Sequence, residues 1–132
     1  MTLASDIRGT AFEQSTPAML ARLVGPAGQH VVPADLASCY YSIFQVDLAN
    51  HDTLTPVDGH DDVELDVNEV FYDSLQTDAA WTRDAVGYNF RHDLDASANE
   101  PLPTAGLTYQ VRYEATAIDG HRLVWRYLIT VI

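Results

Sequence analysis

The densest group of chemically competent side chains is a seven-residue acidic segment in the middle of the chain. Residues 58–64 read Asp-Gly-His-Asp-Asp-Val-Glu, which places four carboxylates around one glycine. Calcium binds several oxygen ligands on a flexible loop, so this segment is a candidate cation site. The spacing does not match the EF-hand loop, which needs ligands at alternate positions and a closing glutamate. A solvated acidic loop is therefore the default interpretation, and calcium binding is the alternative.

The remaining reactive residue types do not form a catalytic pattern. The sequence has no Gly-x-Ser-x-Gly segment for a nucleophilic serine, no His-Glu-x-x-His zinc motif and no glycine-rich phosphate loop. The five histidines are scattered, and His92 has no companion at metal-ligand spacing. The single cysteine, Cys39, lies in an apolar run, where a buried and inert thiol is expected. We expect no catalytic residues, no bound metal, no cofactor and no enzymatic activity.

The charge of the chain excludes two classes of partner. Nineteen acidic and seven basic residues give a formal net charge of −12 over 132 residues, and every basic residue is an arginine. This charge repels nucleic-acid phosphates and the surfaces of anionic membranes, so we expect neither as a partner. No apolar run approaches the length of a membrane-spanning helix, and the first ten residues lack the pattern of a signal peptide. The expected site of synthesis and first residence is therefore the cytoplasm.

The elements that must position these residues are short strands separated by frequent turn signals. Residues 107–117 alternate apolar and polar side chains with a period of two, and residues 88–95 do the same. An Asp119-Gly120 turn joins the first of these strands to another at residues 123–132. Further strands are expected at residues 16–24, 38–47, 63–67 and 70–72, and residues 74–81 form either one helical turn or an irregular loop.

Seven or eight strands with at most a trace of helix indicate an all-β protein, and two features resemble an immunoglobulin-like antiparallel β-sandwich. Residues 106–109 resemble a tyrosine corner, in which the Tyr109 hydroxyl bonds to upstream backbone. Residues 20–31 resemble the strand, glycine turn and return of many bacterial and viral domains of this fold. The antibody pattern of cysteine, tryptophan and cysteine is absent. We expect an N-terminal arm at residues 1–15 and one sandwich domain at residues 16–132.

The last strand predicts a partner surface because both of its faces are largely apolar. In a two-layer sandwich the outer face of a strand has no second layer above it, so apolar side chains there require another cover. Either another chain or the N-terminal arm supplies that cover. A second candidate contact is Trp81, which lies in a long irregular connection. The alternative is that Trp81 anchors a small satellite core within the domain itself. The inner face carries Leu123, Trp125, Tyr127, Ile129 and Val131, and the outer face carries Val124, Leu128 and Ile132.

Three stretches resemble virion structural proteins of tailed phages and prophages. Residues 8–47 resemble the N-terminal domain of phage baseplate upper proteins, in which a sandwich docks a larger assembly. Residues 71–78, together with Trp81 and residues 87–92, resemble small proteins of prophage structural clusters. The resemblance implies a multi-copy structural protein of the tail, neck, baseplate or capsid, with other virion proteins as partners and the virion as its final location. It supplies no catalytic or binding residues.

Two alternative functions follow from the same sequence. A carbohydrate- or calcium-dependent adhesion module would use an aromatic platform or the acidic segment at residues 58–64. An accessory domain of an enzyme complex would have no catalysis of its own. Calcium-dependent melting would favour the first alternative and an adjacent gene for a catalytic protein would favour the second, whereas adjacent portal, capsid or tail genes would favour the particle protein.

Overall fold

Strands make up most of the regular structure of the chain, as the alternating pattern predicts. The computed structural model describes residues 7–12, 15–25, 28–47, 49–50, 53–79, 81, 85–94 and 100–132. Within these ranges it contains nine strands, one single-turn α-helix and one 3₁₀ turn at Pro33–Asp35. The elements are β1 (Ile7–Ala11), β2 (Ala18–Ala21), β3 (Leu36–Val46), β4 (Leu54–Pro56), β5 (Val63–Leu65), α1 (Val67–Val70), β6 (Phe71–Gln76), β7 (Tyr88–Asp93), β8 (Thr108–Ala117) and β9 (Arg122–Val131).

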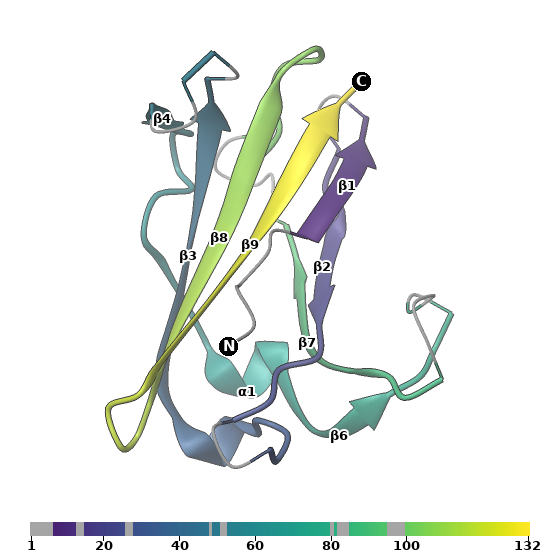
Figure 1. The fold of residues 1–132 in the computed structure, drawn as a ribbon, viewed down its shortest axis with the longest axis vertical. Helices are drawn as coiled ribbons and strands as arrows, with labels where there is room; N and C mark the ends of the chain where they lie inside the picture. The colour runs from purple at the N-terminus through teal and green to yellow at the C-terminus, as the bar shows by residue number, and fades with distance from the viewer. Residues whose placement is uncertain are drawn as a thin grey trace.

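The strands form two sheets that face each other (Figure 1). The larger sheet has the order β1-β9-β8-β3-β4, and β5 also pairs with β3. The smaller sheet has the order β2-β7-β6. When β2, β7 and β6 are taken as strands B, E and D and β3, β8 and β9 as strands C, F and G, this is the connectivity of an immunoglobulin-like sandwich. The predicted fold class is confirmed.

The first strand departs from the other described pairings. β1 runs parallel to β9, from Ile7 opposite Tyr127 to Ala11 opposite Val131, whereas the other strand pairs within the described ranges are antiparallel. Residues 7–11, which the sequence places in an N-terminal arm, therefore form an edge strand of the larger sheet.

A helical turn replaces part of the strand expected near residues 63–72. The side chain of Asp66 accepts a hydrogen bond from the backbone N–H of Asn68 at 2.9 Å, which caps the start of α1. Val70, at the end of the turn, is buried between the sheets. The strand expected at residues 70–72 is present as β6, and it continues through residues 74–76, which were expected to begin a helical turn or loop.

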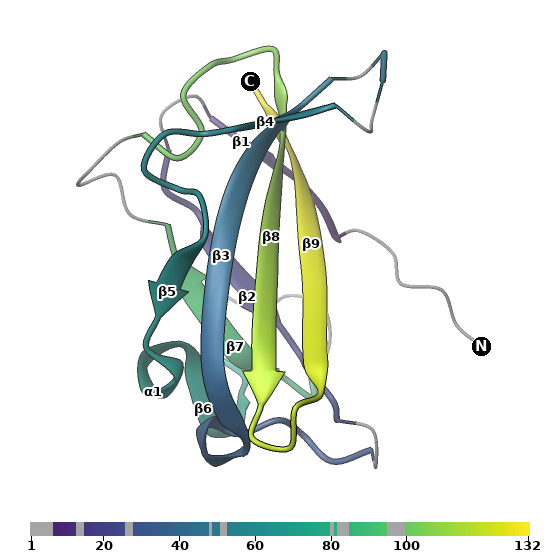
Figure 2. The ribbon, with the colours of Figure 1, turned by 90° about the vertical axis from the view of Figure 1, so that its left-hand side faces the viewer.

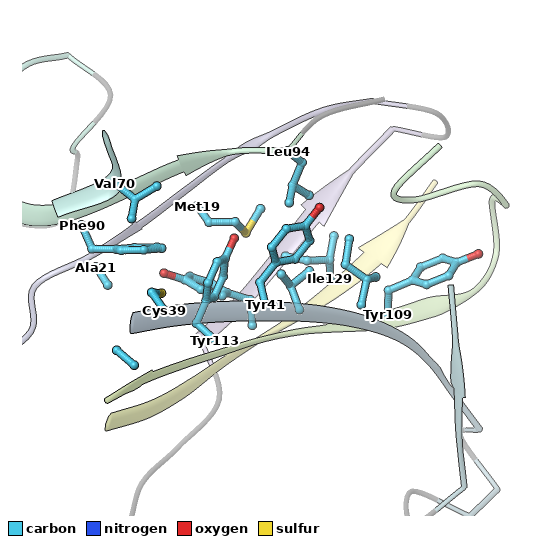
Figure 3. Packing of buried hydrophobic residues seen from close by; sticks show 14 of the residues in the cluster. Met19, Ala21, Cys39, Tyr41, Val70, Phe90, Leu94, Tyr109, Tyr113 and Ile129 are labelled. Atoms are coloured by element: carbon cyan, nitrogen blue, oxygen red, sulfur yellow. The ribbon is translucent and has the colours of Figure 1, made fainter. Parts of the chain in front are cut away.

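Aromatic side chains join the two sheets (Figure 3). The rings of Tyr113 in β8 and Trp125 in β9 stack with centroids 5.5 Å apart and planes 12° from parallel. Phe90 of the smaller sheet meets both rings edge-on, at centroid distances of 4.8 and 5.0 Å. Each such pair contributes about 0.5–1.5 kcal/mol beyond the area that it buries. This cluster ties β7 to β8 and β9 across the two sheets, whereas an antibody domain has a disulfide between strands B and F.

The turn before β8 is held by Tyr109, which is 1% exposed. Its hydroxyl accepts a hydrogen bond from the backbone N–H of Thr104 at 3.2 Å. Gly106 lies between the two residues and has a φ of +85°, a conformation that residues with a Cβ rarely adopt. This is the geometry of the tyrosine corner that residues 106–109 predict.

Candidate interaction surface

The candidate site is the solvent side of the larger sheet, formed by the outward side chains of β3, β8 and β9, and we name it the outer sheet face. Figure 2 shows this face turned toward the viewer, with β2 and β7 behind it. Successive side chains on a strand point to opposite sides, and the strand registers align the outward ones in rows. The three central rows are Tyr40–Glu114–Val124, Ser42–Arg112–Arg126 and Phe44–Gln110–Leu128.

The outer sheet face has an apolar strip that crosses the strands. Phe44 and Leu128 are half-buried, and Gln110 between them is only 8% exposed although it lies on the solvent side. Val124, in another row, is 45% exposed, and Ile132, which follows the end of β9, is 58% exposed. Val124 and Leu128 thus lie on one surface, as the alternation of the last strand predicts.

The described part of the N-terminal segment does not cover this surface. β1 lies beside β9 within the sheet, where its backbone pairs with the edge of β9 (Figure 1). The strand therefore widens the sheet and does not lie over the solvent side of β9. Of the N-terminal arm considered as a cover for Val124 and Leu128, residues 7–11 do not supply it, and residues 1–6 and 13–14 lie outside the described residues.

Trp81 does not belong to the outer sheet face. Its ring centroid lies 5.8 Å from that of Tyr88, a buried residue of β7 in the smaller sheet. Trp81 itself is half-buried there. The structure therefore places it apart from Val124, Leu128 and Ile132.

Positive charge lies on the β8–β9 half of the outer sheet face. Arg112 and Arg126 occupy directly opposed positions on the two strands, an arrangement that destabilises a strand pair. The Nε of Arg112 is buried and has no hydrogen-bond partner among the described residues. Arg122, at the start of β9, forms an ion pair with Glu114. Arg112 and Arg126 thus lie beside this ion pair on the β8–β9 half of the face.

Negative charge lies along the other edge, where β5 pairs with β3. The Tyr40 hydroxyl donates a hydrogen bond to Glu64 of β5 at 3.3 Å, and the backbone N–H of Asp62 donates to Ser42 Oγ at 2.8 Å. The charge of Glu64 and, to a smaller extent, burial and the charge of Asp62 raise the pKa of the Tyr40 hydroxyl. The outer sheet face is therefore bipolar, with carboxylates at the β5 edge and guanidinium groups on β8 and β9.

The acidic segment at residues 58–64 is anchored to the core by its histidine. His60 is 2% exposed, and its Nδ1 lies 2.7 Å from the Tyr41 hydroxyl. Its backbone carbonyl accepts a hydrogen bond from the N–H of Ile43 at 2.7 Å. Across the described part of the chain, which includes this whole segment, no group of three or more His, Cys, Asp or Glu residues is placed to hold a metal ion. The structure therefore adds no support to the calcium alternative.

The other reactive side chains singled out in the sequence are packed between the sheets. Cys39 is fully buried, and desolvation raises the pKa of its thiol to about 12. It therefore stays protonated and a poor nucleophile at neutral pH. The Nδ1 of His92 lies 2.7 Å from the hydroxyl of Tyr113, whose own pKa burial raises well above its usual value. His92 and Tyr113 thus form a hydrogen-bonded pair between the two sheets.

A pocket of about 380 Å³ opens where the β8–β9 hairpin meets the connection between β2 and β3. Asp119 and His121 lie on its rim, with the His121 Nδ1 2.9 Å from the Asp119 carboxylate. Hydrogen bonds from the backbone and then the side chain of His121 lower the pKa of Asp119. The alternation of apolar and polar residues along the strands could not predict this pocket, because the residues that line it come from separate turns. The wall includes Val31, Leu36, Ala117, Ile118 and Leu123.

Comparison with known proteins leaves the fold and this surface as the basis for function. No protein-family model, no curated protein and no solved structure matches the chain. Among the described residues, no helix is both long enough and apolar enough to cross a membrane. The chain is thus defined as an immunoglobulin-like sandwich with a bipolar, partly apolar sheet face.

Proposed function

We propose that this chain is a non-enzymatic structural protein that docks through its outer sheet face into a multi-copy particle of the tailed-phage type. The observation that carries the proposal is the composition of that face. Apolar side chains gathered on one surface, here Phe44 and Leu128 on either side of Gln110, favour an interface there.

The kind of particle is proposed from the sequence resemblance. Residues 8–47 resemble a docking domain of phage baseplates, and residues 71–78, with Trp81 and residues 87–92, resemble prophage structural proteins. A sandwich suits this role because its paired strands present a rigid surface that need not order on binding. The partners on this proposal are other virion proteins, and the final location is the virion.

The proposal is tested by expressing the chain with the genes adjacent to its own and separating particles on a density gradient. Electron microscopy of the particle fraction should show regular assemblies, and wild-type chain should sediment with them. We expect Leu128→Asp to remain folded but to stay in the free fraction, since the substitution places a charge in the apolar strip. Leu75→Asp is the matched control, because Leu75 is equally half-buried but lies on β6 of the smaller sheet.

Two results would contradict the proposal. Particles that form without this chain would remove its structural role. Retention of folded Leu128→Asp in the particles, at the level of the Leu75→Asp control, would show that the outer sheet face is not the contact surface. If Leu128→Asp unfolds the isolated chain, as measured by circular dichroism, Leu128 belongs to the core, and the assignment of this face is wrong.

A further inference from the structure

We propose that the pocket between the β8–β9 hairpin and the β2–β3 connection binds a small organic cation, an amine carried on a flat apolar ring system. We name this cavity the hairpin pocket. It lies at one end of the sandwich, where the hairpin and the start of β3 come together (Figure 2). This end is distant from Phe44 and Leu128 of the outer sheet face, so the inference goes beyond the proposed function and does not depend on it.

Backbone hydrogen bonds fix the two sides of the hairpin pocket. The N–H of Ile118 donates to the carbonyl of Asp35 at 2.9 Å, which ties the hairpin to the 3₁₀ turn before β3. On the other side, the N–H of Gly25 donates to the carbonyl of Gln29 at 2.8 Å and closes a turn in the β2–β3 connection. The pocket is therefore largely preformed, as small-molecule sites usually are, and a ligand does not have to order these segments.

The volume of the hairpin pocket suits a fused two-ring ligand with a short side chain. The pocket holds about 380 Å³, which falls within the range of roughly 300–1,000 Å³ that small-molecule sites occupy. An apolar cavity of about 150 Å³ already accepts one benzene ring. The hairpin pocket therefore has room for about two rings and a side chain of a few atoms.

Apolar side chains form the wall that contacts the ring system. Leu36 and Ala117 lie opposite each other on β3 and β8, and Leu123 lies near them on β9. Ile118, at the hairpin, is 70% exposed in the chain without a ligand. A ligand in the pocket removes part of this apolar surface from water, which favours binding.

The charges around the hairpin pocket favour a cation. Asp35 and Asp119 both line it. Arg122 lines it too, but its guanidinium is paired with Glu114 on the outer sheet face. The Nδ1 of His121 lies 2.9 Å from the carboxylate of Asp119. Asp35 forms no ion pair with another described residue, so its charge is left for a ligand.

The carboxylates at the pocket have capacity to accept further hydrogen bonds. Among the described residues, the carboxylate of Asp35 accepts one long bond, at 3.4 Å from the N–H of Val32. Hydrogen bonds from His121 lower the pKa of Asp119, which keeps that carboxylate ionised well below neutral pH. The net charge of −12 also raises the local concentration of cations and repels anions. An ammonium group thus finds both a charge and an acceptor here.

The test compares three indoles that share a ring and differ in charge. Tryptamine carries an ammonium group, tryptophol has a hydroxyl in the same place, and indolepropionate carries a carboxylate. Each is titrated into the isotope-labelled chain, and binding is followed by heteronuclear NMR. The reporters are the backbone amides of Ala117 and Ile118, whose N–H groups donate to carbonyls of His121 and Asp35 in the lining of the pocket.

We expect tryptamine to shift both amide signals with a dissociation constant of a few millimolar, the usual affinity of a ligand of about twelve non-hydrogen atoms. Tryptophol should bind about threefold more weakly, because it lacks the ion pair with Asp35. Indolepropionate should bind about tenfold or more weakly than tryptamine, since like charges meet at the pocket.

Two substitutions locate the site and its charge. Asp35→Asn should weaken tryptamine about threefold and leave tryptophol unchanged, since only the charge is removed from an exposed side chain. Asp73→Asn is the matched control, because it removes the same charge from the exposed surface of β6 in the smaller sheet. Ala117→Leu should abolish binding of all three indoles, because the larger side chain fills the pocket. The dispersion of the NMR signals shows whether each variant is folded.

Several results would overturn the inference. Signals of Ala117 and Ile118 that do not move at about tenfold the expected dissociation constant would do so. Equal affinity for tryptamine and tryptophol, or equal effects of Asp35→Asn and Asp73→Asn, would show that the carboxylate does not select the ligand. Tighter binding of indolepropionate would assign the pocket to an anion. If Ala117→Leu does not fold, the indole series and Asp35→Asn still decide the outcome.

Discussion

Individual buried polar side chains hold the segments that connect the strands of this sandwich in place. The side-chain oxygen of Asn89 in β7 accepts a hydrogen bond from the N–H of Leu23, and its amide donates to the carbonyls of Leu23 and Val31. The Tyr127 hydroxyl donates to the carbonyl of Leu20 at 2.7 Å across the two sheets. A buried polar group that loses its partner costs about 1–3 kcal/mol, so each of these bonds specifies where the chain turns back.

Tyr109→Phe tests one such bond. The substitution removes the acceptor of the Thr104 N–H and keeps the aromatic ring in the core. Since Thr104 is exposed and its N–H can turn to water, we expect the free energy of unfolding to fall by about 1 kcal/mol, measured by urea denaturation. Tyr40→Phe is the control, because that hydroxyl bonds on the surface, and it should leave stability unchanged within error. Equal stability of wild type and Tyr109→Phe would argue against a structural tyrosine corner.

At the scale of the elements, the alternation of apolar and polar residues predicts which side chains of a strand face the core and which face solvent. The period of two in residues 107–117 and 123–132 assigns Tyr109 to the core and Leu128 to the solvent side, because a strand cannot turn one side chain without turning all of them. The sequence pattern alone does not show that Phe44 and Arg112 lie on the same surface. Their positions on that surface depend on the register between β3 and β8, which are far apart in the chain.

The elements that the sequence did not predict are those fixed by distant contacts or by one cap. β1 reads Ile-Arg-Gly-Thr-Ala, which has little strand character of its own and is held by its pairing with β9. α1 interrupts a run of valines because Asp66 caps it and Val70 gains a place in the core. Local propensity cannot reveal either contact, and tertiary pairing overrides it.

The acidic loop gives a prediction at this scale. Because His60 and the backbone bond to Ile43 already hold residues 58–64 against β3, the fold does not depend on a cation to shape them. We expect the melting temperature to be the same in millimolar calcium and in excess chelator, measured by differential scanning fluorimetry. A ligand that binds the native state alone must stabilise it. A rise of several degrees with calcium would therefore move the adhesion function to first place.

For the whole molecule, the uneven placement of charge matters more than its sum. The net charge of −12 includes only seven arginines, and three of them, Arg112, Arg122 and Arg126, lie on the outer sheet face. Two copies of the chain therefore repel at long range.

The net repulsion between two copies is large in the absence of salt. Two compact chains of this length have centres roughly 30 Å apart when in contact. At that separation, charges of −12 repel by about 20 kcal/mol in pure water. The Debye length falls from about 30 Å at 0.01 M salt to about 8 Å at 0.15 M, so most of this repulsion disappears over that range. Contacts between guanidinium and carboxylate groups act over a few ångströms and are screened less.

Self-pairing of the wild-type chain should therefore become tighter, not weaker, as salt rises from 0.01 to 0.15 M. Sedimentation equilibrium at several salt concentrations measures the change, and the dissociation constant should fall at least tenfold across this range because a loss of 1.4 kcal/mol of repulsion is sufficient. A basic partner bound to the same acidic chain would show the opposite trend, since salt would screen an attraction. If self-association instead weakens steadily from the lowest salt upward, attraction between unlike surfaces outweighs the net repulsion between the acidic chains.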